Sequence, residues 1–169
     1  MNNWVLVGES GVMMLSGEYN VILDDKYRIT LPAGMRKELD VSSVVITKGE
    51  DKCLWLYTVE KWEERFGDTL KENTDPFSKM DRRVLRKFVG PSQKIDIDKA
   101  GRILLPESLR EYASITKDCI VLGQIDFMEI WNVNSYREYC DEDDEKNAGE
   151  FEAATEELSR KIKRNRGVE

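Results

Sequence analysis

The chain has 169 residues, of which 40% are hydrophobic and 35% charged, a composition typical of a globular protein rather than a disordered one. No apolar run approaches the roughly 20 residues that span a bilayer, and no basic segment precedes an apolar stretch at the N-terminus, so we expect a cytoplasmic protein with no membrane partner. Histidine is absent, which removes the commonest general base and the commonest metal ligand.

Carboxylates and thiols are present, but nothing in the sequence combines them into a nucleophile, a base and an orienting group. The candidates are Glu63, Glu64, Asp96, Asp98 and the cysteines Cys53, Cys119 and Cys140. No C-x-x-C pair occurs, which predicts reduced thiols rather than disulfides or a zinc site. Walker and Rossmann phosphate loops are also missing. We therefore expect no catalytic residue, no metal, no cofactor and no small-molecule substrate.

The net charge of -7 is unevenly distributed. Residues 141–157 contain nine acids and one lysine, a net of -8, so the remaining 152 residues sum to +1. Because physiological salt screens charges beyond about 8 Å, local patches decide binding, and the acidic total does not exclude a nucleic-acid partner.

The first predicted element follows an extension, residues 1–13, which we place ahead of a natural start at Met14. An internal repeat then dominates the sequence. Residues 24–65 align without a gap with residues 98–139, at a constant offset of 74. The identical pairs include Asp24/Asp98, Arg28/Arg102 and Arg36/Arg110. We infer a tandem duplication.

The first copy, residues 14–74, is predicted to be a small α+β unit. Strands are expected at 19–23 and 28–31 around a tight turn, followed by a short helix from Pro32 to about Leu39. A hairpin is expected next, with strands at 44–47 and 53–57. Thr58 is suited to cap the helix that follows.

A linking helix is predicted over residues 75–89, with Asp75 as its N-cap and Pro76 in its first turn. Apolar residues recur at helical spacing at 77, 80, 84 and 88. The other face carries Arg82, Arg83, Arg86 and Lys87. This basic face is either simply solvated or a DNA contact.

The second copy, residues 90–140, repeats the order of elements, and residues 141–169 follow as an acidic helix with a basic tail. The helix places Phe151, Ala154, Leu158 and Ile162 on one side, which favours docking on the body or on a neighbouring subunit. Units of this size bury little surface, so they usually share a core or oligomerise.

The element Asp-x-x-x-Arg occurs once in each copy, at 24–28 and 98–102. An aspartate that opens a turn accepts backbone N–H groups, and an arginine just after the turn offers a planar donor fork to guanine or to a phosphate. The alternative is structural: each Asp pairs with its own Arg and ties the turn together. The sequence leaves both possibilities open.

These blocks resemble the MraZ family. The resemblance rests on Met14–Tyr19, Leu23-Asp24, Arg28–Pro32 and the second block Asp98–Pro106 with Glu129–Trp131, and it covers about residues 14–140. It implies an α+β, mainly β fold: tandem AbrB-like swapped-hairpin units packed as a pseudo-twofold β-barrel with peripheral helices. It also implies a repressor that binds direct repeats in double-stranded DNA upstream of its own operon, the division and cell-wall gene cluster. The expected protein is a ring-forming homo-oligomer associated with the nucleoid.

The resemblance implies that Arg28 and Arg102 face the DNA while Asp24 and Asp98 shape the turns. Lys26 and Lys99, inside the turns, are candidate phosphate contacts. Gly101 gives the second turn the residue that the family usually has before the arginine, whereas the first copy has Tyr27. Since glycine accepts a positive φ without steric cost, Tyr27 predicts a strained, displaced or different first turn.

The main alternative is an AbrB-type module for protein assembly, such as an antitoxin-like partner binder without a specific DNA target. The acidic C-terminal region with its apolar stripe favours it. Aromatic stacking on single-stranded nucleic acid is a weaker alternative, because Trp55, Tyr57, Trp62, Trp131 and Tyr136 fall at strand and helix positions that predict packing.

Overall fold

The computed structural model describes residues 14–167, without the side chains of 143–145 and 148. The expected extension, residues 1–13, lies outside the described residues. One compact unit ends at Val133 and a second begins at Asn134. The first copy contributes β1 (Glu18–Ile22), β2 (Arg28–Thr30), α1 (Ala33–Leu39), β3 (Ser43–Lys48) and β4 (Leu54–Thr58). The second contributes β5 (Gln93–Asp96), β6 (Arg102–Leu104), α5 (Glu107–Tyr112), β7 (Asp118–Gly123) and β8 (Met128–Asn132).

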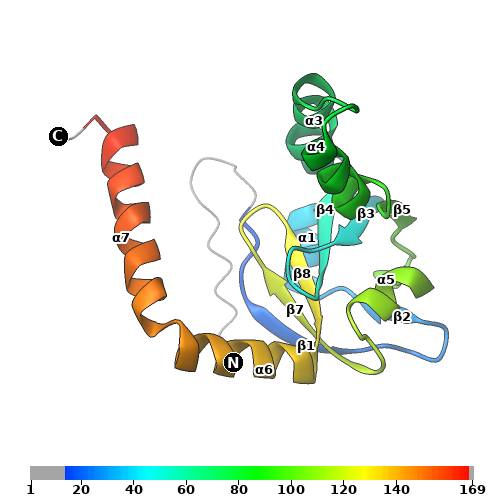
Figure 1. Cartoon of the computed structure of the whole chain (residues 1–169). Coiled ribbons are helices and arrows are strands. Elements are labelled where there is room, and N and C mark those ends of the chain that lie inside the picture. The colour runs from blue at the N-terminus through cyan, green and yellow to red at the C-terminus, as the bar shows by residue number, and fades with distance from the viewer. Residues whose placement is uncertain (1–13, 168–169) are drawn as a thin grey trace. The chain divides into compact units, whose positions relative to one another are not determined.

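The strands form two antiparallel sheets that mix the copies (Figure 1). The larger has the order β1-β7-β8-β4-β3-β5, and the smaller is the pair β2-β6. Thus β1 of the first copy pairs with β7 of the second, and β5 of the second pairs with β3 of the first. Each copy therefore completes the sheet of the other.

The barrel is not confirmed, because the described strands make one open six-stranded sheet and one separate pair, with no closed sheet among them. The pseudo-twofold packing stays a prediction. The strands themselves lie within one or two residues of the predicted ranges, but β2 pairs with β6 rather than with β1 across its own turn.

The core lies between the two sheets and the helices α1 and α5. Ile29 and Ile103, at the centres of β2 and β6, are fully buried, as are Leu31 and Leu105 just after them. Pro32 and Pro106 then occupy the N-cap positions of α1 and α5. The alternation of buried and exposed residues along β2 and β6 fixes which side chains point away from the core.

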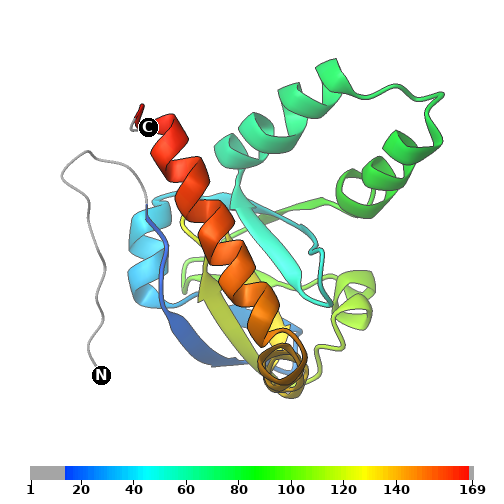
Figure 2. The same ribbon diagram turned by 60° about the vertical axis from the view of Figure 1, so that its left-hand side comes forward.

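Between β4 and β5 the chain leaves the sheet through helical segments and returns (Figure 2). These are α2 (Val59–Trp62), the π-helical η1 (Glu63–Gly67), α3 (Asp68–Asn73), α4 (Lys79–Val84) and the π-helical η2 (Leu85–Val89). The Thr58 cap is confirmed, since its hydroxyl accepts a hydrogen bond from the Lys61 N–H at 3.1 Å. The Trp55 ring stacks on the Phe88 ring, with centroids 5.2 Å apart, and this contact holds η2 against the sheet.

The predicted start of the linking helix was wrong. Ser78, not Asp75, caps α4 by accepting from the Asp81 N–H at 3.2 Å, while Asp75 closes a separate turn by accepting from the Phe77 N–H. The Phe77 side chain is 91% exposed, so it is no part of a buried stripe.

The second unit contains α6 (Val133–Lys146) from its second residue onward and all of α7 (Ala148–Asn165). Its apolar residues Phe151, Leu158 and Ile162 are exposed, so their docking stays a prediction. The basic residues from Arg160 onward were expected to form a tail, but α7 includes them as far as Asn165. Across residues 14–167, no helix is both long enough and apolar enough to cross a membrane.

Candidate nucleic-acid interface

The first Asp-x-x-x-Arg element forms a closed turn between β1 and β2. The Asp24 carboxylate accepts hydrogen bonds from the backbone N–H groups of Lys26 and Arg28, both at 2.9 Å. Its other oxygen accepts from the Arg28 Nε at 2.9 Å. The backbone closes the same turn, because the Asp24 N–H donates to the Arg28 carbonyl and the Tyr27 N–H donates to the Asp24 carbonyl.

The second element repeats this pattern at every position. The Asp98 carboxylate accepts from the N–H groups of Ala100 and Arg102 at 2.9 Å, and from the Arg102 Nε at 2.7 Å. The N–H groups of Asp98 and Gly101 close the turn. The two aspartates therefore accept the same set of hydrogen bonds in the two turns.

The pKa values of both aspartates lie below the ordinary value. The main cause is the hydrogen bond from the backbone N–H of Arg28 to Asp24, and of Arg102 to Asp98, which stabilises the charged carboxylate. The guanidinium groups contribute further in the same direction. Both carboxylates are therefore ionised at neutral pH.

The turns are joined to each other although they lie 74 residues apart. The Leu31 N–H donates to the Gly101 carbonyl and the Leu105 N–H donates to the Tyr27 carbonyl, both at 2.9 Å. Between these bonds β2 and β6 pair with Arg28 opposite Leu104 and Thr30 opposite Arg102. The pair is thus a two-stranded ribbon with a turn at each end, hereafter the ribbon.

Both arginines lie on the outer face of the ribbon. Ile29 and Ile103 fill the inner face, so the alternate residues Arg28, Thr30, Arg102 and Leu104 face outward. Diagonal neighbours in such a pair are about 7–8 Å apart, so two guanidinium groups share one small surface. The Arg28 side chain is 24% exposed and that of Arg102 is 36% exposed.

The structural alternative is also present, since each arginine pairs with its own aspartate. This pairing occupies the Nε atoms, and the Arg28 Nη1 lies 3.9 Å from the Asp98 carboxylate as well. The Nη atoms of Arg102 make no hydrogen bond or ion pair with any residue in the described part of the chain. The aspartates hold the guanidinium groups in place without using all of their donors.

Tyr27 adopts a φ of 61°, close to the 76° of Gly101, so the first turn is neither displaced nor of a different kind. The conformation is one that side chains rarely adopt. The Tyr27 ring is covered by Arg110 of the other copy, whose Cζ lies 3.8 Å from the ring centroid. Arg36, the partner of Arg110 in the repeat, lies instead over Gly101 and donates to the Ala100 carbonyl at 3.0 Å.

Arg36 and Arg110 had no predicted role at the site. The structure brings each of them to the turn of the opposite copy. Both are arginines at the same position of the two copies, and this identity could have pointed to a shared role. Lys26 and Lys99 are exposed at the tips of the turns, and their contact with phosphates stays a prediction.

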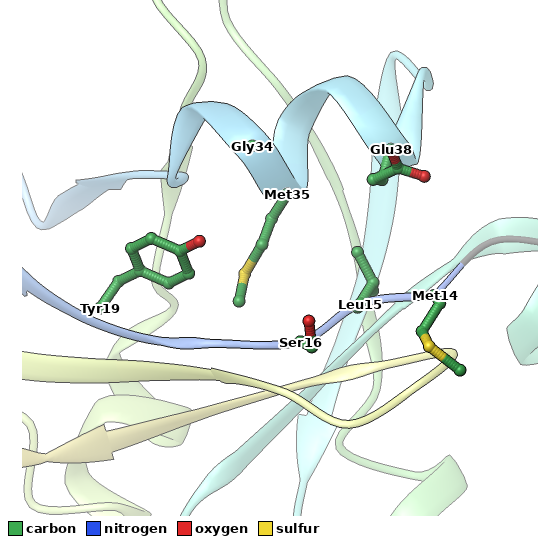
Figure 3. Close-up of a pocket in the computed structure, with 7 residues that line it drawn as sticks. All are labelled: Met14, Leu15, Ser16, Tyr19, Gly34, Met35 and Glu38. Atoms are coloured by element: carbon green, nitrogen blue, oxygen red, sulfur yellow. The ribbon is translucent and has the colours of Figure 1, made fainter. Parts of the chain in front are cut away.

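Two of the three cysteines lie in the core. Cys53 and Cys119 are buried free thiols, and burial raises the pKa of Cys119 to about 11 and that of Cys53 further. Among the side chains that the structure describes, no three or more cysteines or carboxylates form a group that could hold a metal ion. Figure 3 shows the pocket beside α1, where Leu15, Tyr19 and Met35 surround a space of only about 10 Å³, room for little more than one water molecule.

Comparison with known proteins matches the chain twice to one family. The family model described as "MraZ protein, putative antitoxin-like" matches residues 14–87 and again residues 88–161. A protein named transcriptional regulator MraZ from Treponema denticola is 43% identical over 128 residues, covering 76% of this chain and 88% of its own.

Two further relatives carry the same name. The protein from Moorella thermoacetica is 39% identical over 146 residues, covering 86% of this chain and 96% of its own. The one from Treponema pallidum is 37% identical over 143 residues, covering 85% and 93%. Both matches extend through most of the two copies. The chain therefore belongs to the MraZ family.

Proposed function

We propose that this chain is a transcription regulator that binds double-stranded DNA through the outer face of the ribbon. Arg28 and Arg102 would contact base edges, and Lys26 and Lys99 would contact phosphates. The protein would act in the cytoplasm, associated with the nucleoid, and repress its own operon, the division and cell-wall gene cluster.

One observation carries this proposal: two arginines 74 residues apart are presented by the same face of one two-stranded ribbon. A β-ribbon is narrow enough to enter a DNA groove, and several DNA-binding proteins use one in this way. The aspartates fix the arginine side chains before binding, which reduces the entropy lost when DNA is bound.

Two arginines and two lysines in one subunit give modest, salt-sensitive affinity. A ring of subunits that meets several direct repeats would convert the later contacts into effectively intramolecular ones. The proposed ring therefore explains how so small a surface supports regulation.

The test is fluorescence anisotropy with the DNA upstream of the protein's own gene, over a salt series. We expect Arg28→Ala and Arg102→Ala each to weaken binding by roughly 10-fold to 100-fold, since a good bidentate base contact is worth about 1–3 kcal/mol. Affinity should also rise steeply with the number of repeats in the DNA.

Arg65→Ala is the matched control, because it removes an exposed arginine from η1, outside the ribbon. It should leave DNA affinity unchanged. Equal affinity of the native protein for its own upstream DNA and for a scrambled duplex would overturn the proposal, as would native affinity in the Arg28→Ala/Arg102→Ala double variant.

A second candidate function is antitoxin-like binding of a protein partner, and the exposed apolar side chains of α7 favour it. Phe151 is 72% exposed, Leu158 57% and Ile162 44%, and a protein partner could cover this apolar side of α7. Phe151→Ser/Leu158→Ser separates the two functions, because it would abolish partner binding and leave the ribbon's DNA contacts intact.

A further inference from the structure

A second concentration of positive charge lies outside the ribbon. An open cleft of about 450 Å³, hereafter the basic cleft, is formed by the β3–β4 hairpin, by the α4–η2 segment and by α5. The residues that line it are Lys48, Glu50, Lys52, Arg83, Arg86, Lys87 and Tyr112. The basic face of the linking segment is therefore not an isolated solvated surface, because the hairpin adds two lysines to it.

Tyr112 organises the hairpin side of the basic cleft. Its hydroxyl donates to the Gly49 carbonyl at 2.9 Å, which ties α5 to the hairpin. The ammonium groups of Lys48 and Lys52 lie 5.0 and 4.5 Å from the Tyr112 ring centroid, so both are attracted to the same ring. Two like charges are thus held near each other, and an anion between them would relieve their repulsion.

Little of this charge is neutralised within the chain. Lys87 donates to the Glu50 backbone carbonyl at 3.0 Å and lies 3.6 Å from the Glu50 carboxylate, the one acid that lines the cleft. Asp51 lies next to the hairpin tip, where its carbonyl faces the Tyr112 hydroxyl at 3.2 Å. Among the described residues, none forms an ion pair with Lys48, Lys52, Arg83 or Arg86.

The basic cleft lies close to the ribbon, because α5 contacts both. α5 follows β6 almost directly, and its Arg110 covers Tyr27 in the first turn while its Tyr112 lines the cleft. The two surfaces thus adjoin the same short helix. Phosphates flank a major groove about 12 Å wide, so a duplex whose groove holds the ribbon can present its backbone to the basic cleft.

We propose that the basic cleft binds the phosphate backbone of the duplex whose bases the ribbon contacts. This inference rests on the proposed function and adds to it a sequence-independent anchor. The chemistry fits phosphates, because lysines and arginines from two segments surround an open space with one carboxylate. Binding there would supply affinity and salt dependence, while the ribbon supplies specificity.

The test uses the full chain with the charge-neutral variant Lys48→Gln/Lys52→Gln/Arg83→Gln/Arg86→Gln. Anisotropy is measured over a salt series with the cognate duplex and with a scrambled duplex of equal length. We expect affinity for both to fall in parallel, and the salt slope to shrink by about 0.9 for each phosphate that the variant no longer neutralises. The ratio of the two affinities should stay at its native value.

The matched control is Lys37→Gln/Lys71→Gln/Lys117→Gln/Lys163→Gln, which removes the same charge from exposed positions outside the segments that form the cleft. It should change the slope far less. If the first variant does not fold, as judged by circular dichroism, Lys52→Gln/Arg86→Gln should show about half of the effect.

Three results would overturn the inference while leaving the proposed function standing. An unchanged salt slope is the first, and a slope change equal to that of the control is the second. The third is unchanged DNA affinity with an altered oligomer size, which would assign the basic cleft to the acidic segment 141–157 of another subunit. If instead the native protein does not prefer its own upstream DNA, the proposed function itself fails.

Discussion

The first and second turns of the ribbon have the same hydrogen bonds but different neighbours. In both, one carboxylate oxygen accepts two backbone N–H groups and the other accepts the arginine Nε. In the first turn, however, an aromatic ring stands where the second has glycine. Arg28 also has a second carboxylate at 3.9 Å, whereas Arg102 pairs with Asp98 alone.

The aspartate and the arginine define the turn, and the residue before the arginine decides which side chain lies over it. Tyr27 reaches a positive φ because the rest of the turn requires it, and Arg110 then packs on its ring. Over Gly101 the same position in the repeat, Arg36, lies directly against the backbone. A side chain at position 101 would therefore displace Arg36, whereas the first turn already holds a side chain at the same position.

Gly101→Ala should have the largest effect on stability. A Cβ at this position would overlap the Arg36 Nη1, and the φ of 76° would be strained as well. We expect a loss of about 1–3 kcal/mol in the free energy of unfolding. Chemical denaturation at a fixed protein concentration measures it.

Tyr27→Ala is the control for Gly101→Ala, because it adds no atoms and leaves an alanine at the same kind of φ. Tyr27→Ala should lower the free energy of unfolding clearly less than Gly101→Ala does. Equal losses in the two variants would mean that the turns do not differ in their tolerance of a side chain.

Acid should weaken both turns alike. The folded pKa values of Asp24 and Asp98 are lowered, so their contribution to stability is complete above the ordinary aspartate pKa of about 3.9 and is lost as the pH falls below it. In Asp24→Asn/Asp98→Asn this acid-dependent part should be missing. Thermal unfolding measured from pH 6 to pH 3 gives the dependence of Tm on pH, which is compared between the native protein and the double variant.

Asp25→Asn serves as the control for the acid experiment, because this exposed neighbour takes no part in the hydrogen bonds of the described turn. Its pH profile should follow that of the native protein. A double variant with an unaltered acid slope would contradict the assigned hydrogen bonds.

The smallest effect concerns the ring contact of the first turn. A double-mutant cycle with Arg110→Ala and Tyr27→Ala should give a coupling of about 0.5–1 kcal/mol, the range of cation–π contacts at partly exposed sites. Arg36→Ala with Tyr27→Ala should give no coupling, because Arg36 lies over the other turn. A coupling of equal size in both cycles would remove the distinction.

The positions of strands and helices followed from the sequence, because alternation, turn residues and the repeat are local signals. Pairing partners were not accessible to the same reasoning. The two copies are chemically alike, so periodicity alone cannot tell whether β1 pairs within its own copy or with β7; the exchange was implied by the family resemblance. Ser78 replaced Asp75 as the helix cap because both residues satisfy the same local pattern.

The candidate site divides in the same way. The Asp–Arg turns were predicted, since their hydrogen bonds join residues at most four positions apart. The contacts of Arg36 and Arg110 and the basic cleft were not, because they join residues far apart in the chain. Of the outcomes predicted at Tyr27, the strained backbone is present, with a φ of 61°, whereas a different kind of turn is not. Arg110, which contacts the Tyr27 ring, comes from the other copy and was not predicted to lie there.

The exchange of strands has a consequence for the chain as a whole. Because β7 supplies the neighbour of β1 and β3 supplies the neighbour of β5, neither half contains a complete sheet. The tandem chain is in effect a dimer joined by a peptide linker. A half made alone would expose unpaired strand edges until it met a second molecule of itself, and proteolysis between the halves would not separate them.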